Sequence, residues 1–305
     1  MNDTTKQLLE LVSNWDGGFE GAFNIREDGG CAARQSTKNI QITSKTDQSG
    51  LEIHVKPGTV GERVYIPACV TKGGIDDLVY NDFYIGEGAD IVVVAGCGVH
   101  NAEDSEARHN GIHRFFVGKG AHVRYEEKHL GTGNGSGARV IDPVTDVHLE
   151  EDAVLEMDTT QLGGVDHSRR VTTGHLAARA RLLIRERLMT DGEEVAQTDF
   201  EVDLDGEDSG VDLVSRSVAK GHSKQSYRSV IRGNARCTGH SECDAIIADQ
   251  GVDRAARELV ANNGDAALIH EAAIGKIAGE QLLKLQTLGL TREEAEQKII
   301  SGFLK

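Results

Sequence analysis

The segment from Arg236 to Asp244 (Arg-Cys-Thr-Gly-His-Ser-Glu-Cys-Asp) combines residue types that hold metals. Two thiols, Cys237 and Cys243, flank the imidazole of His240. Two carboxylates lie beside them, those of Glu242 and Asp244. Thiolate and imidazole are the ligands of iron–sulfur clusters and of Zn²⁺. Cys237 and Cys243 share a face of a strand if no turn intervenes, but Gly239 favours a turn. Because the Cys-x5-Cys spacing differs from that of a structural zinc knuckle, metal binding and simple burial both stay open.

Two other groups of residues carry weaker signals of the same chemistry. Cys97 and His100 occur in the stretch Gly-Cys-Gly-Val-His-Asn, and His109 and His113 follow closely. These residues form either a metal site or a polar loop between strands. The adjacent pair His270–Glu271 is a further candidate, although one histidine beside one glutamate is ordinary by itself.

Motifs of common enzyme classes are absent from the sequence. It contains no Gly-x4-Gly-Lys-Ser/Thr phosphate loop, no Gly-x-Gly-x-x-Gly dinucleotide motif and no Gly-x-Ser-x-Gly nucleophile elbow. We therefore expect a protein that is not itself an enzyme.

Composition excludes several other classes of function. The formal net charge of -16 argues against a nucleic-acid partner, because binding a phosphate backbone requires a basic surface. No apolar run approaches the ~20 residues of a membrane-spanning helix, and the first residues do not resemble a secretory signal. We expect a cytoplasmic protein. The 5 cysteines are an odd number, which argues against a disulfide framework.

The elements that must position these residues are strands. Between residues 36 and 270, apolar and polar residues alternate with the period of a half-buried strand. A repeat of 32 residues is visible, in which Ile85–Ile91 matches Val117–Val123 and then Leu149–Leu155. A repeated unit that cannot bury its own apolar face is stabilised by stacking on its neighbours. The pattern predicts a mainly β protein with a parallel β-helix (solenoid) core, and the competing fold is an antiparallel sandwich or barrel.

Both ends of the chain have helical character. Residues 1–35 are expected to form a short N-terminal helix and a loop, and residues 271–305 a C-terminal αα-hairpin that caps the solenoid. Ala278, Leu282, Leu285 and Leu288 form the apolar stripe of the first hairpin helix. Thr291 and Glu294 form a capping box that opens the second helix, whose apolar face carries Ala295, Ile299 and Phe303. Leu283 and Ile300 lie off these two faces, with Glu280 at the border, which predicts a surface for a partner protein.

The C-terminal third resembles a known family. The motifs are Gly221-His-Ser-Lys-Gln-Ser-Tyr-Arg228, Glu242-Cys-Asp244, Ala267-Leu-Ile-His-Glu-Ala-Ala273 and the helical segment from Glu280 to Phe303. Together they resemble the SufB/SufD family, the scaffold subunits of Suf-type iron–sulfur cluster assembly. With the Gly-Cys-Gly-Val-His-Asn and Arg-Tyr-Glu-Glu-Lys-His segments, which look like the short prokaryotic members, the resemblance extends over about residues 85–305.

The resemblance implies a function, partners and site residues. It implies a β-helix scaffold that carries a transient iron–sulfur cluster, pairs with a second SufB/SufD-type subunit (here a homodimer) and binds a SufC-like ABC ATPase through its C-terminal helices. It implies cluster-site roles for Cys243, His270 and Glu271. Larger SufB proteins carry a second cysteine shortly after the Cys-Asp pair, whereas no cysteine follows Cys243 here. The sequence does not decide whether a flavin is bound.

Two alternative functions remain at this point. One is a structural adaptor that docks the ATPase without holding a cluster. The other, less favoured, is a solenoid enzyme that acts on a sugar polymer through carboxylates on an exposed coil.

Overall fold

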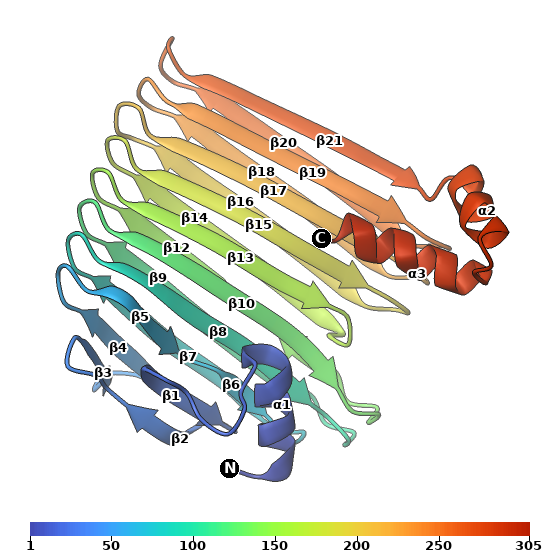
Figure 1. Cartoon of the computed structure of the whole chain (residues 1–305), viewed down its shortest axis with the longest axis horizontal. Helices are drawn as coiled ribbons and strands as arrows, with labels where there is room; N and C mark the ends of the chain where they lie inside the picture. The colour runs from blue at the N-terminus through green and yellow to red at the C-terminus, as the bar shows by residue number, and fades with distance from the viewer.

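The computed structural model covers residues 1–305, and the chain winds through 21 strands that form two facing sheets (Figure 1). Sheet A contains β1 (Ala22–Glu27), β2 (Gly30–Gln35), β5 (Val60–Tyr65), β6 (Ala68–Val70), β8 (Asp90–His100), β10 (His122–Thr132), β13 (Val154–Leu162), β15 (Arg181–Thr190), β17 (Gly210–Ala219), β19 (Thr238–Ile247) and β21 (Ala267–Lys276). Sheet B contains β3 (Ile40–Ser44), β4 (Gly50–Val55), β7 (Asp76–Ile85), β9 (Ala107–Val117), β11 (Arg139–Ile141), β12 (Val144–Leu149), β14 (His167–Leu176), β16 (Val195–Leu204), β18 (Lys224–Gly233) and β20 (Val252–Ala261). Successive strands alternate between the sheets from β7 onward, apart from the β11–β12 pair, so each coil contributes one strand to each sheet.

The strand pairing confirms the parallel solenoid and excludes the antiparallel sandwich. All strand pairs are parallel except β1–β2 and β3–β4 at the N-terminal end. The strands reach beyond the expected core, from Ala22 to Lys276. Alternate residues point into the space between the sheets, which we call the lumen, and a single apolar cluster of 37 buried residues runs through it.

The sequence repeat corresponds to the corner between the two sheets. The three repeated turns join β7 to β8, β9 to β10 and β12 to β13. Gly88 and Gly120 have φ of 63° and 62°, and Asp152 takes the same left-handed conformation in the third turn. The turns stack because Gly88 N–H donates to the carbonyl of Lys119, 3.0 Å away.

The N-terminal helix α1 (Asp3–Ser13) lies on the outer face of sheet A. The alternation that points Cys97 into the lumen points Gly96 and Gly98 outward, under this helix. A Cβ atom on Gly96 would lie 2.6 Å from the backbone oxygen of Val12, and one on Gly98 would lie 2.9 Å from Leu8. The two glycines therefore allow the helix to approach the sheet.

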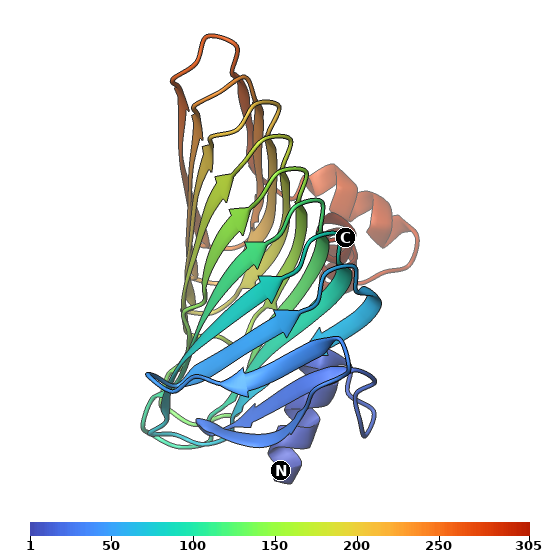
Figure 2. The same cartoon turned by 90° about the vertical axis from the view of Figure 1, so that its left-hand side faces the viewer.

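The C-terminal hairpin forms as predicted but does not cap the solenoid. It consists of α2 (Gly279–Thr287) and α3 (Arg292–Phe303), and the capping box of Thr291 and Glu294 is present. Helix α3 packs across the outer face of sheet A, where Ile300 and Leu304 contact Val218. Both helical segments thus lie on the same side of the solenoid (Figure 2). No helix of the chain is long and apolar enough to cross a bilayer.

The last coil is consequently open. Strands β20 and β21 are the terminal strands of their sheets, and each pairs with only one neighbour. Nine of the ten residues of β21 are exposed, and among its residues that face the lumen only Leu268 is partly buried. The uncapped coil presents an unpaired backbone edge and an uncovered lumen surface, and such edges are templates for pairing with another chain.

Candidate functional site

Two of the predicted cluster ligands lie on the lumen face at the open end of the solenoid, His270 on the last coil and Cys243 on the coil before it. In the parallel register, His270 of β21 lies opposite Ser241 of β19, and Ala272 lies opposite Cys243. His270 and Cys243 therefore point into the lumen from adjacent strands, two register positions apart. Cys243 is 1% exposed, whereas His270 is exposed because no further coil covers it.

A half-buried cation and a half-buried carboxyl group lie beside the thiol of Cys243. Burial raises the pKa of Cys243 to about 12, and the charge of Asp253 adds to this, while Arg257 opposes it. Arg257 is opposite Ser229 in the register of sheet B, and its Nε and one Nη are buried without a hydrogen-bond partner. In the single chain the thiol is thus protonated at neutral pH, with a cation held next to it.

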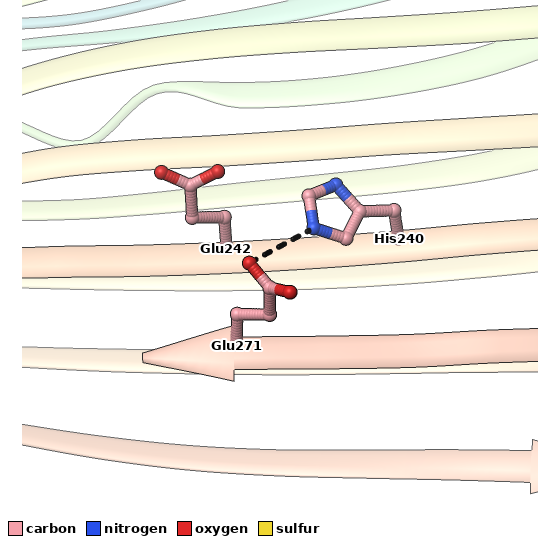
Figure 3. A group of neighbouring side chains, drawn as sticks. All are labelled: His240, Glu242 and Glu271. Atoms are coloured by element: carbon pink, nitrogen blue, oxygen red, sulfur yellow. Dashed lines mark ion pairs between the residues drawn. The ribbon is translucent and has the colours of Figure 1, made fainter. Parts of the chain in front are cut away.

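The other predicted ligands lie on the opposite side of the sheet. His240, Glu242 and Glu271 point outward from β19 and β21, and one ligand atom from each lies within 4.8 Å of the others (Figure 3). His240 Nε2 is 4.0 Å from the carboxylate of Glu271, while its Nδ1 is 2.8 Å from Asp212. A carboxylate that holds one ring nitrogen and leaves the other facing further ligands is the usual support of a metal-binding histidine.

The electrostatics of this outer group favour a cation. Burial, together with the neighbouring Asp244, raises the pKa of Glu242. Asp212 has the opposite behaviour: burial would raise its pKa, but His240 and Arg185 lower it. The group holds one imidazole and two carboxylates, a donor set that suits a borderline divalent cation such as Zn²⁺ or Fe²⁺. Asp212 is the member that sequence reasoning missed, and the available signal is its position 28 residues, one coil, before His240.

The structure corrects the predicted grouping of Cys237 with Cys243. No turn intervenes at Gly239, and both thiols point into the lumen. However, Cys237 precedes β19, and Cys243 is six residues further along the chain within that strand. At ~3.3 Å per residue the two thiols are about 20 Å apart, so they cannot bind one metal ion.

Cys97 and His100 do not form a site with each other. Cys97 points into the lumen, where burial raises the pKa of its thiol well above the ordinary value. His100 is three residues further along β8, on the outer face of the sheet, and its Nδ1 is 3.0 Å from the hydroxyl of Thr132. Gly96 and Gly98, which flank Cys97, leave the space in which helix α1 packs against the sheet.

The predicted docking residues of the hairpin divide into two sets. Leu283 is 62% exposed and Glu280 is exposed, as expected for residues off the packed face. Ile300 is 5% exposed and packs against Val218, so its assignment to a docking surface is wrong. Ala295, on the predicted apolar face of α3, is also buried, at 0% exposure. Leu288, expected on the packed stripe, is 75% exposed.

A buried polar network, missed in the sequence, lies deeper in the lumen. Arg170 donates to Glu127 at 2.7 Å and lies 3.6 Å from Glu186. The hydroxyl of Tyr125 donates to Glu127 at 2.8 Å, and His129 lies 3.2 Å from the same carboxylate. Burial would raise the pKa of Glu127, but Arg170 and His129 hold it well below its ordinary value.

The fold defines the chain as a parallel β-solenoid with an open C-terminal coil, and comparison with known proteins gives its family. Residues 81–303 match the family described as SUF system FeS cluster assembly, SufBD core domain. This match covers most of the chain, which therefore belongs to the SufBD family of iron–sulfur cluster assembly proteins.

Individual relatives agree with this assignment. The chain is 28% identical over 264 residues to an "Iron-sulfur cluster assembly SufBD family protein" of Methanothermobacter thermautotrophicus. The alignment covers 85% of this chain and 63% of that relative. A protein of the same description from Archaeoglobus fulgidus is 27% identical over 267 residues, covering 87% and 70% of the two chains. The chain thus spans about two thirds of the length of these relatives.

Proposed function

We propose that this chain is a non-catalytic scaffold subunit on which an iron–sulfur cluster is assembled, and that the cluster forms at the open coil. The observation that carries the proposal is the placement of His270 on the lumen face of the open coil, with Cys243 on the same face of the adjacent strand β19. Family membership supports the cargo, since the matched domain is described by iron–sulfur cluster assembly.

A second subunit is required to complete the ligand set. Each chain offers one thiol close to His270, because Cys237 lies about 20 Å from Cys243 along the lumen and the other three cysteines lie in β2, β6 and β8 at the opposite end of the solenoid. Two copies joined at their open coils bring two thiols and two imidazoles together, a combination found in some two-iron clusters. The unpaired edges of β20 and β21 supply the backbone groups through which such copies pair.

The energy source in this proposal is a separate SufC-like ATPase. The chain has no phosphate loop of its own. Helix α2 has no buried residue and exposes Leu283 beside Glu280, which provides an apolar centre with a charged border for the ATPase. Binding of nucleotide by the ATPase would then favour one arrangement of the two scaffolds over another and expose Cys243.

Anaerobic reconstitution with iron and sulfide tests the proposal. The wild-type protein is expected to develop visible charge-transfer absorbance, Cys243→Ser to lose it, and Cys31→Ser, which changes an exposed thiol at the other end, to keep it. A wild-type protein that stays colourless with and without the ATPase would favour the adaptor. In vivo, the adaptor predicts full activity after combined substitution of Cys237, Cys243 and His270.

A further inference from the structure

A second cluster of potential metal ligands lies inside the solenoid, far from the open coil. His109 and His113 both point into the lumen from β9, and they are 4% and 7% exposed. They line a cavity of about 30 Å³, which has room for one or two atoms of the size of water. Between them in the strand is Gly111, which also faces the cavity.

The hydrogen bonds of His109 direct one nitrogen at this cavity. Its Nδ1 lies 3.0 Å from the carboxylate of Asp77, which can only accept, so Nδ1 carries a proton. Arg26 already neutralises Asp77 through three contacts of 2.6–3.0 Å. With the proton on Nδ1, the neutral tautomer of His109 has its lone pair on Nε2.

His113 reaches the same state through a different relay. The hydroxyl of Tyr125 uses its only proton to donate to Glu127 at 2.8 Å. The Nδ1 of His113, 2.8 Å from the same hydroxyl, must therefore donate to it, which leaves the lone pair of His113 on Nε2. Phe83 and Tyr125 pack edge-on against the imidazole and fix its orientation.

The two lone-pair nitrogens converge on Gly111. A Cβ atom at Gly111 would lie 3.1 Å from Nε2 of His113 and 3.3 Å from Nε2 of His109. Asn81, which is opposite His113 on β7, lines the same cavity, and its Oδ1 is buried with no hydrogen-bond partner. The imidazoles of His109 and His113 and the unpaired amide oxygen of Asn81 thus surround one small space. Any side chain at position 111 larger than that of glycine would fill this space.

We propose that His109, His113 and Asn81 form a lumenal binding site for a borderline divalent metal ion, Zn²⁺ or Fe²⁺. Imidazole suits both ions. Asp77 behind His109, and Tyr125 with Glu127 behind His113, match the outer shell found around metal-binding histidines. The site is built from residues other than those of the open coil, so it does not depend on the proposed cluster function.

Titration with Co²⁺ tests the site, because Co²⁺ occupies zinc sites and its visible bands report nitrogen ligands. The background variant combines His240→Ala and Cys243→Ser, which removes the outer group and the open-coil thiol. We expect this protein to bind one Co²⁺ per chain and to gain thermal stability from it. Gly111→Ala in the same background should abolish both effects, because the added methyl group occupies the space between the two nitrogens.

Two further variants separate loss of the site from loss of the fold. Tyr125→Phe breaks the relay to His113 with little change of shape, and we expect an affinity about 10–100-fold lower. His148→Gln changes a histidine on the outer face and should leave the affinity unchanged. The proposal is overturned if the background variant binds no Co²⁺, or if its affinity survives both Gly111→Ala and Tyr125→Phe in proteins whose circular dichroism is unchanged.

Discussion

Substitution of Arg170 by Met should strongly destabilise the solenoid. Arg170 is 5% exposed and lies between Glu127 and Glu186, which are 4% and 5% exposed. With an effective dielectric constant of about 20, the attraction is about 6 kcal/mol across the 2.7 Å contact to Glu127 and about 5 kcal/mol across the 3.6 Å contact to Glu186. Removing Arg170 also removes its own desolvation cost of several kcal/mol, so we expect a net loss of about 3–5 kcal/mol at pH 7.

The pH dependence of this loss follows from the pKa of Glu127. In the wild type that pKa is depressed, so the stabilisation is present above the unfolded value near 4.5 and is lost as the pH falls through the lower folded value. Without Arg170, burial dominates and raises the folded pKa above the unfolded one, so the variant loses stability as the pH rises. The difference between the proteins should therefore grow from pH 5 to pH 7.

Urea unfolding followed by circular dichroism at both pH values measures this difference. Arg179→Met is the matched control, because Arg179 pairs with Asp152 on an exposed corner and its removal should change the midpoint little. A loss below about 1 kcal/mol for Arg170→Met at pH 7, or a loss that shrinks toward pH 7, would refute the electrostatic reasoning.

Two other predictions concern the terminal helices. Gly96→Ala should displace α1, because the new Cβ lies 2.6 Å from a backbone oxygen of the helix. Limited proteolysis should then cleave the N-terminal segment faster than in the wild type. Gly18→Ala is the control, because its new Cβ meets no atom within 4 Å and should leave the cleavage rate unchanged. If both variants are cleaved as slowly as the wild type, the inference that α1 packs closely against Gly96 is wrong. Leu283→Asp should abolish ATPase association in a pull-down while leaving the melting temperature unchanged, whereas Leu285→Asp, half-buried in the hairpin, should lower it. A Leu283→Asp protein that melts far below wild type would show that this residue is part of the core.

Much of the fold could be predicted because the sequence repeats it. The 32-residue period from Ile85 to Leu155 equals the strand register, in which Ile91 lies opposite Val123 and Val123 opposite Leu155. Beyond this point the register offset shortens, as in the pairing of Leu182 with Val211. Arg179 and Asp208 take the left-handed turn position that glycine holds in the earlier turns, so the later coils show no visible repeat.

The sites were harder to predict, because the identity of a polar residue on a strand does not show whether its side chain points into the lumen or outward. Glu127 continues the inward series of Val123 and Tyr125, but its charge suggests solvent, and only the position of Arg170 43 residues later explains its burial. The same alternation separates His270 from its neighbour Glu271, which the motif groups together. The error at Ile300 arose because the helix sequence does not specify which face meets the sheet.

Native mass spectrometry under anaerobic conditions, on protein co-expressed with a SufC-like ATPase as the proposed partner, tests the central proposal most directly. If the cluster is assembled between two open coils, the mass of iron and sulfide will appear on species that contain two copies of this chain and will be absent from single copies. The Cys243→Ser protein will then form the same two-copy species without that added mass. A cluster carried by single chains, or one retained in full by Cys243→Ser, would contradict the proposal.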